Sequence, residues 1–217
     1  MKINSLDVSI DNLKEYIITM MEKCEVAIDK SVTCMVNRDI EGAKEVIKDD
    51  DIINELREQI RNKSIELIVL KQPMARDLRI IYAFANISIE LERIGDYAAN
   101  ISKEMLEIVK EAYIKDLIDI PKMSEVCVEM LAKTRHSLEN LDTKLAYSIG
   151  DMDDEVDHLY TLVKRDSLGI MHRKPETIDQ GVKLLFIGRY LERIGDHITN
   201  VCEQIIYAVD GDMVEIG

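Results

Sequence analysis

The chain has 217 residues and a formal net charge of −14 at pH 7, with three prolines, nine glycines and no tryptophan. It contains no stripe of Lys and Arg that could bind nucleic-acid phosphates, and its acidic balance disfavours direct attachment to anionic lipid. The N-terminal segment lacks the apolar core of a signal peptide, and no later segment has the roughly 18–20 apolar residues that a membrane span needs. These features predict a cytoplasmic protein built from α-helices.

Apolar residues that recur alternately every three and four positions predict three long helices in the first half of the chain. The first helix follows residues 6–34. The second begins after Asp39, a candidate N-cap, and ends at the break formed by Gln72 and Pro73. The third has an unbroken apolar stripe over residues 80–108.

The segment from 113 to 124, which contains Pro121, is predicted to be a connector. Three further helices are then predicted over residues 123–141, 145–170 and 184–208. Asp142 is the candidate N-cap of the second of these, and a loop containing Pro175 precedes the last.

The two halves carry matching features in the same order. LERIGD occurs at residues 91–96 and again at 191–196, and Asp39 is separated from Asp142 by the same 103 positions as Asp50 from Asp153. A duplicated three-helix unit explains this register. We therefore predict an all-α fold of two tandem, pseudo-symmetric three-helix bundles with six long helices, over residues 1–114 and 115–217.

The cysteines contain no CxxC pair, and they fall largely on the apolar stripes. We expect Cys24, Cys34, Cys127 and Cys202 to be buried, reduced thiols rather than disulfides or zinc ligands.

Helical spacing places oxygen-bearing side chains in rows, because residues four apart on a helix lie about 5–6 Å from one another at Cβ. One row lies in each LERIGD helix, and a shorter row lies on the helix before it. The first-half candidates are Asp50, Asn54, Glu92, Asp96 and Asn100, and those of the second half are Asp153, Asp157, Glu192, Asp196 and Asn200.

Antiparallel neighbouring helices could bring these rows together on the outer surface of each bundle. Carboxylates so placed repel one another unless a counter-ion is bound. A solvated acidic face is the ordinary interpretation of a single such pair, but matched rows in both halves favour binding of divalent or multinuclear metal ions. Oxygen ligands suit Mg, Mn, Ca or iron, and Zn is also compatible.

Gly95 and Gly195 lie in the middle of predicted helices, where glycine costs about 1 kcal/mol relative to alanine. They indicate close approach by a backbone, a ligand or an ion, or simple helix packing.

The sequence has no HExxH, P-loop or GxGxxG motif and only one ExxH, at Glu155–His158, whereas a ferritin-like di-iron centre needs two. We expect no enzymatic activity; the alternatives are a metal-dependent hydrolase or oxidase that uses surface carboxylate-bound ions, and a structural bundle with solubilising acids.

Several stretches together resemble the PhoU family of phosphate-uptake regulators over essentially the whole chain. They are KQPMARDLR at 71–79, LERIGDYAANI at 91–101, DDEVDHLY at 153–160 and RYLERIGDHITNVCEQIIY at 189–207. The resemblance implies two similar three-helix bundles, with surface metal ions held by E/DxxxD pairs that match Glu92 with Asp96 and Glu192 with Asp196.

The resemblance also implies a homodimeric negative regulator of phosphate uptake and phosphate-starvation signalling. Such a protein contacts the ATPase of the phosphate ABC transporter and a sensor histidine kinase, as an adaptor rather than a catalyst. This chain has Asn54 in its first half where the second half has Asp157, so its first site is expected to bind metal more weakly. The basic, proline-containing corner at 71–79 has no counterpart in the second half.

Overall fold

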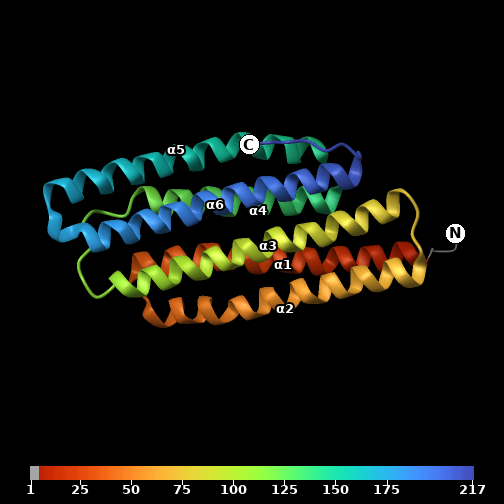
Figure 1. The fold of residues 1–217 in the computed structure, drawn as a ribbon, viewed down its shortest axis with the longest axis horizontal. Coiled ribbons are helices and arrows are strands. Elements are labelled where there is room, and N and C mark those ends of the chain that lie inside the picture. The colour runs from red at the N-terminus through yellow and green to blue at the C-terminus, as the bar shows by residue number, and fades with distance from the viewer. Residues whose placement is uncertain (1–4) are drawn as a thin grey trace.

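The structure is a computed structural model that describes residues 5–217 and consists of helices (Figure 1). The elements are α1 (Ser5–Asn37), α2 (Ile40–Lys71), α3 (Arg76–Ile108), α4 (Asp119–Asn140), α5 (Thr143–Arg173), the short 3₁₀ helix η1 (Pro175–Thr177) and α6 (Ile178–Val209). The order α1 to α3 followed by α4 to α6 confirms the predicted all-α fold of two tandem three-helix repeats.

The predicted helix caps are confirmed at the start of the second helix in each repeat. The Asp39 carboxylate accepts a hydrogen bond from the Gly42 amide at 3.0 Å, and Asp142 accepts one from the Leu145 amide at 3.1 Å. Each bond satisfies one of the free amides in the first turn. α2 ends where predicted, because Gln72 takes a left-handed conformation (φ 46°) immediately before Pro73.

Two connections are shorter than the sequence pattern predicted. α4 already begins at Asp119, with Pro121 in its first turn. Proline is tolerated there because the amides of the first turn have no hydrogen-bond acceptor within the helix. α5 extends to Arg173, and η1 leads directly into α6 at Ile178. The connector between the repeats is therefore limited to residues 109–118, and the predicted division at 114/115 falls within it.

The packing joins the two repeats along their length (Figure 1). α3 lies beside α6, with α2 against α3 and α5 against α6, while α1 and α4 contact each other as well as α3 and α6, respectively. Buried apolar side chains of both repeats, including Ile17, Leu91, Met130 and Leu191, belong to one continuous core. This packing fixes the seams α2/α3 and α5/α6, in which the predicted acidic rows lie.

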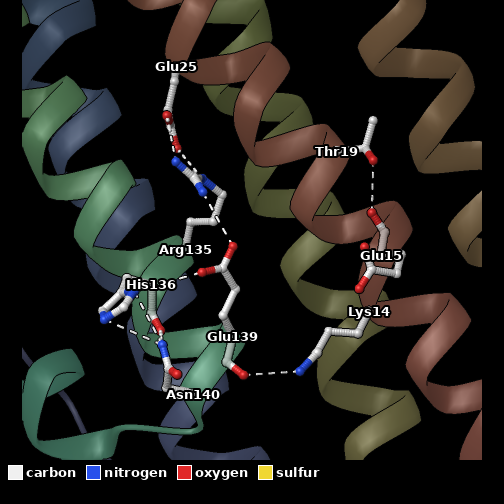
Figure 2. Close-up of polar contacts among 8 residues, drawn as sticks. All are labelled: Lys14, Glu15, Thr19, Glu25, Arg135, His136, Glu139 and Asn140. Atoms are coloured by element: carbon white, nitrogen blue, oxygen red, sulfur yellow. Dashed lines mark hydrogen bonds and ion pairs between the residues drawn. The ribbon is translucent and has the colours of Figure 1, made fainter.

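A polar clamp on the α1/α4 side also joins the repeats (Figure 2). The Arg135 guanidinium of α4 donates from Nε to Glu25 of α1 at 2.9 Å and from Nη1 to Glu139 at 3.3 Å. Lys14 of α1 donates to the main-chain carbonyl of Glu139 at 3.2 Å. On the α3/α6 side, Glu90 accepts hydrogen bonds from His197 at 2.6 Å and from Asn200 at 3.0 Å.

The cysteines are free and buried, as predicted. Cys24 donates its thiol to the carbonyl of Leu91 at 3.3 Å, and Cys127 donates to the carbonyl of Leu191 at 3.4 Å, so the first residue of each LERIGD segment receives the same contact. Within residues 5–217, no helix combines the length and the hydrophobicity that crossing a membrane requires.

Candidate metal centres

The acidic side chains of the second repeat, which we call the second cluster, are centred on Asp153 of α5. Asp153 faces Gly195 of α6. A Cβ atom added to Gly195 would clash with Asp153 Oδ1. The missing side chain therefore lets the carboxylate lie against the α6 backbone, where only 8% of Asp153 is exposed. Of the interpretations offered for Gly195, the structure shows helix packing, because the groups that approach it are side chains of the neighbouring helix, Asp153 and Val156.

The electrostatic environment of Asp153 is unfavourable to its charge. Burial, together with the negative potentials of Asp196, Asp157 and Glu192, raises the pKa of Asp153 from 3.8 to about 7. The Asp153 carboxylate makes no hydrogen bond or ion pair with any group in residues 5–217. A buried carboxylate without a partner destabilises the fold unless it is protonated or a cation approaches it.

Glu192 and Asp196 complete this cluster on α6 and are partly neutralised by arginines of the same helix. Arg189 pairs with Glu192 Oε1, and Arg193 donates to Asp196 at 2.9 Å. Glu192 Oε2 is buried without a hydrogen bond, since the Arg193 Nε atom, at 3.9 Å, is too far away to donate one. Burial, followed by the charge of Asp196, raises the pKa of Glu192.

The first cluster resembles this arrangement at the α2/α3 seam. Asp50 Oδ1 lies 3.0 Å from the position that a Cβ of Gly95 would take, beside Ile53 Cδ1 at 2.9 Å, and it is buried without a hydrogen bond. Asp50 Oδ2 accepts a hydrogen bond from Asn54 at 3.2 Å, and Arg93 donates to Asp96 at 3.3 Å. Burial and the charge of Asp96 raise the pKa of Asp50.

Not every predicted ligand takes part in these contacts. Glu92 is half-buried and makes no hydrogen bond or ion pair within the described part of the chain. The Asn100 amide accepts a hydrogen bond from Lys103 at 3.1 Å, whereas Asn200 is held by Glu90 across the interface between the repeats. Glu90 was not predicted as a functional residue; it immediately precedes LERIGD, at the position where the second repeat has Tyr190.

One acid lies deeper than predicted. The sequence pattern placed the acids on the outer surface, and Asp157 is exposed there, but Asp153 is buried in the seam, where Gly195 lets its carboxylate lie against α6. Across residues 5–217, no three His, Cys, Asp or Glu side chains are already close enough to form a metal-binding group. Binding of an ion would therefore require rotation of carboxylates and release of the contacts of Arg93, Arg189 and Arg193.

The residues present nevertheless fit a hard cation. The donors are oxygens, two of them (Asp50 Oδ1 and Glu192 Oε2) are buried without hydrogen bonds, and Gly95 and Gly195 let the aspartates lie against the neighbouring helix. Two of the competing pairs, Arg93 with Asp96 and Arg193 with Asp196, are partly exposed and of the kind that contributes at most about 1 kcal/mol each.

The fold defines a class of all-α proteins built from two tandem three-helix repeats, with an acidic seam in each repeat. Comparison with known families agrees with the division into two repeats. The PhoU domain matches residues 17–105 and again 120–205, one copy in each repeat. The chain therefore belongs to the PhoU family.

Two relatives and one solved structure illustrate this membership. The Phosphate-specific transport system accessory protein PhoU homolog of Clostridium acetobutylicum is 33% identical over 208 residues, which are 95% of each chain. The protein of the same description from Aquifex aeolicus is 36% identical over 206 residues, which cover 95% of this chain and 93% of the relative. The crystal structure of the phosphate transport system regulatory protein PhoU from Streptococcus pneumoniae matches with a TM-score of 0.90 and 25% identity, over 98% of this chain and 100% of that one.

The chain is thus a PhoU-like accessory protein of phosphate transport and not an enzyme. The alternative of a metal-dependent hydrolase or oxidase is set aside on this ground.

Proposed function

We propose that the protein is a negative regulator of phosphate uptake and of phosphate-starvation signalling. It acts in the cytoplasm as a homodimeric adaptor that contacts the ATPase of a phosphate ABC transporter and a sensor histidine kinase. The similarity of the whole chain to proteins described as accessory and regulatory components of phosphate transport supports this role.

The two acidic clusters bind divalent cations in this function. The first cluster consists of Asp50, Glu92 and Asp96, with Asn54 and Asn100 as weaker donors; the second consists of Asp153, Asp157, Glu192 and Asp196, with Asn200 as a weaker donor. The observation that carries this assignment is Asp153, a buried carboxylate that lies among acids and has no partner in the described residues.

A bound cation would neutralise the repulsion within each cluster and link the helices on either side of its seam. Mg, Mn and iron suit oxygen donors, whereas Zn more often takes nitrogen and sulfur. The second cluster binds more tightly than the first, because Asp157 brings a charge where the first has the neutral Asn54.

An exposed apolar surface gives the adaptor a place for partner contact. We call it the α2–α3 corner. It consists of Ile65, Ile68, Val69, Leu70, Met74, Leu78 and Tyr82, and Met74 is 80% exposed. These side chains are close in sequence on either side of one turn, and exposed apolar patches mark interaction sites in soluble proteins. The turn in this corner contains Ala75 with φ 44°, a conformation that is costly for a residue other than glycine.

The experiment is a pull-down with the immobilised full chain, using the transporter ATPase and the cytoplasmic part of the sensor kinase, each in MnCl₂ and in EDTA. Wild type is expected to retain both partners, and Met74→Glu is expected to lose them while keeping its metal content. Val26→Glu is the matched control, since Val26 is an exposed apolar residue on α1, outside the corner. Failure of wild type to retain either partner in both conditions would contradict the adaptor role, and a monomer in light scattering would contradict the homodimer.

A further inference from the structure

We infer that a basic groove between α5 and the connector binds a small phosphate-bearing anion. The groove has a volume of about 390 Å³ and is lined by Lys115, Arg165, Asp166, Gly169, Ile170 and Arg173. It lies near the end of α5 that leads through η1 into α6, the end drawn on the left in Figure 1. Three cations and one carboxylate line it, in a chain whose net charge is −14.

Asp166 holds two of these cations in place. Its Oδ2 atom lies 3.1 Å from Lys115 Nζ, and its Oδ1 atom lies 3.2 Å from Arg165 Nε. Lys115 also reaches Asp119 at 3.4 Å, so a residue of the connector is tied to both α4 and α5. The hydrogen bond from Lys115, with further help from Arg165, lowers the pKa of Asp166. Asp166 thus positions the two cations beside the groove.

Arg173 is the third cation, and its guanidinium makes no hydrogen bond or ion pair with other residues in 5–217. Arg165, Gly169 and Arg173 follow one another at four-residue spacing and therefore share one face of α5. Guanidinium groups bind phosphate oxygens through paired N–H donors, which a carboxylate or phosphate accepts side by side. Arg173 is thus free to make such a contact.

Gly169 leaves open the space between these two arginines. A Cβ added to Gly169 would meet only Arg173 Nη1, at 3.7 Å, and no atom of another helix. Helix packing therefore does not explain this glycine, although glycine within a helix costs about 1 kcal/mol relative to alanine. A simpler explanation of Arg173 is the favourable interaction of a cation with the C-terminal end of the α5 dipole. That explanation does not account for Gly169, or for Lys115, which lies in the connector.

The volume and the apolar side chain of Ile170 leave room for an organic group beside a phosphate. The ligand class is therefore a phosphate group, either free or carried by a small ester such as a nucleoside monophosphate. Since none of the lining residues belongs to the two acidic clusters, the groove does not depend on the proposed metal sites.

The test is isothermal titration calorimetry of the full chain at low ionic strength with inorganic phosphate and, separately, with adenosine 5′-monophosphate. The two variants are Arg173→Ala and Gly169→Leu; the latter fills the groove without changing its charge and places a good helix former where the structure has space. Lys144→Ala is the control, because it removes one exposed positive charge from the opposite end of α5. Circular dichroism confirms that each variant is folded, and every titration is repeated in EDTA.

We expect saturable binding of at least one probe, weakened about ten-fold in both groove variants and unchanged in Lys144→Ala and in EDTA. Tighter binding of the nucleotide would identify an ester as the ligand, and equal or tighter binding of phosphate would identify the free ion. Absence of saturable binding, equal affinity in all proteins, or loss of binding in EDTA would overturn the inference.

Discussion

Asp153 of α5 directs its Oδ1 atom at the place where a side chain of residue 195 on α6 would stand. Asp50 of α2 also lies beside Gly95 of α3, with its Oδ1 atom 3.0 Å from the position of a Cβ, but Ile53 Cδ1 is slightly nearer, at 2.9 Å. The glycine of LERIGD thus leaves space for an aspartate of the preceding helix in the second repeat, and for an aspartate and an isoleucine in the first. The duplicated motif preserves a contact between helices as well as a row of acids.

Gly195→Ala tests whether this space is needed for cation binding. The added Cβ would displace the carboxylate of Asp153, so we expect Mn²⁺ affinity at the second cluster to fall about ten-fold or more while the protein stays folded. Calorimetric titration with Mn²⁺ measures this. Gly169→Ala is the matched control: its Cβ would make only an ordinary contact with Arg173 Nη1, at 3.7 Å, so it should leave Mn²⁺ binding unchanged and raise stability by up to about 1 kcal/mol. Unaltered affinity in Gly195→Ala would show that the space has no part in binding.

The raised pKa of Asp153 predicts a pH dependence of the metal-free protein. The pKa of Asp153 is about 7 in the folded state and 3.8 ordinarily, so between these pH values the folded protein keeps a proton on Asp153 that the unfolded chain has released. The contribution of Asp153 to the free energy of unfolding is therefore fully present below about pH 4 and is lost as the pH rises toward 7. Asp153→Asn should match wild type at low pH and be the more stable protein at pH 8. Thermal unfolding in EDTA at pH 4, 6 and 8 measures the difference, and a pH-independent difference would contradict it.

The Glu25–Arg135 pair predicts coupling between the repeats. Both side chains are more than 70% buried and bond through two nitrogen–oxygen contacts, so Arg135→Ala should lower the free energy of unfolding by about 1–3 kcal/mol. A double-mutant cycle with Glu25→Ala isolates the interaction of the two side chains. The control is Arg61→Ala, whose pair with Glu58 is exposed and lies within α2, and it should cost less than about 0.5 kcal/mol. Similar decreases of the free energy of unfolding in Arg135→Ala and Arg61→Ala would contradict a stabilising role of the Glu25–Arg135 pair.

Buried thiols predict slow chemical modification of the native protein. Burial raises the pKa of Cys202 to about 12 and raises that of the other three cysteines as well, so few thiolates are present at neutral pH. A thiol-specific disulfide reagent should label no cysteine rapidly in the native protein and all four after denaturation. A fast-reacting thiol in the native state would show that one of them is accessible.

Apolar spacing predicted the helices well, because each long helix buries one stripe and the stripe continues as long as the helix does. It failed at Pro121, which the first turn of α4 accommodates, and at the loop around Pro175, which forms η1. Spacing also placed Asp153 and Asp50 on the edge of their helix that faces the LERIGD helix. It could not give the depth of Asp153, since its burial depends on how α5 packs against α6.

The sequence pattern could not predict contacts between distant segments, for a different reason. Such contacts depend on how the repeats and the connector pack together. Examples are the hydrogen bond from Asn200 to Glu90 and the hydrogen bond from Lys115 to Asp166. No local spacing encodes these pairs. A difference at one position, Glu90 where the second repeat has Tyr190, was the available signal for the first of them.

Cation binding by the two acidic seams is most directly tested by Mn²⁺ titration of EDTA-treated, dialysed protein, with wild type compared with Asp153→Asn and Asp50→Asn. We predict two classes of site in wild type, the tighter lost in Asp153→Asn and the weaker lost in Asp50→Asn. Lys144→Ala should keep both. No saturable binding in wild type, or identical titrations of all the proteins, would contradict the claim that these seams hold cations.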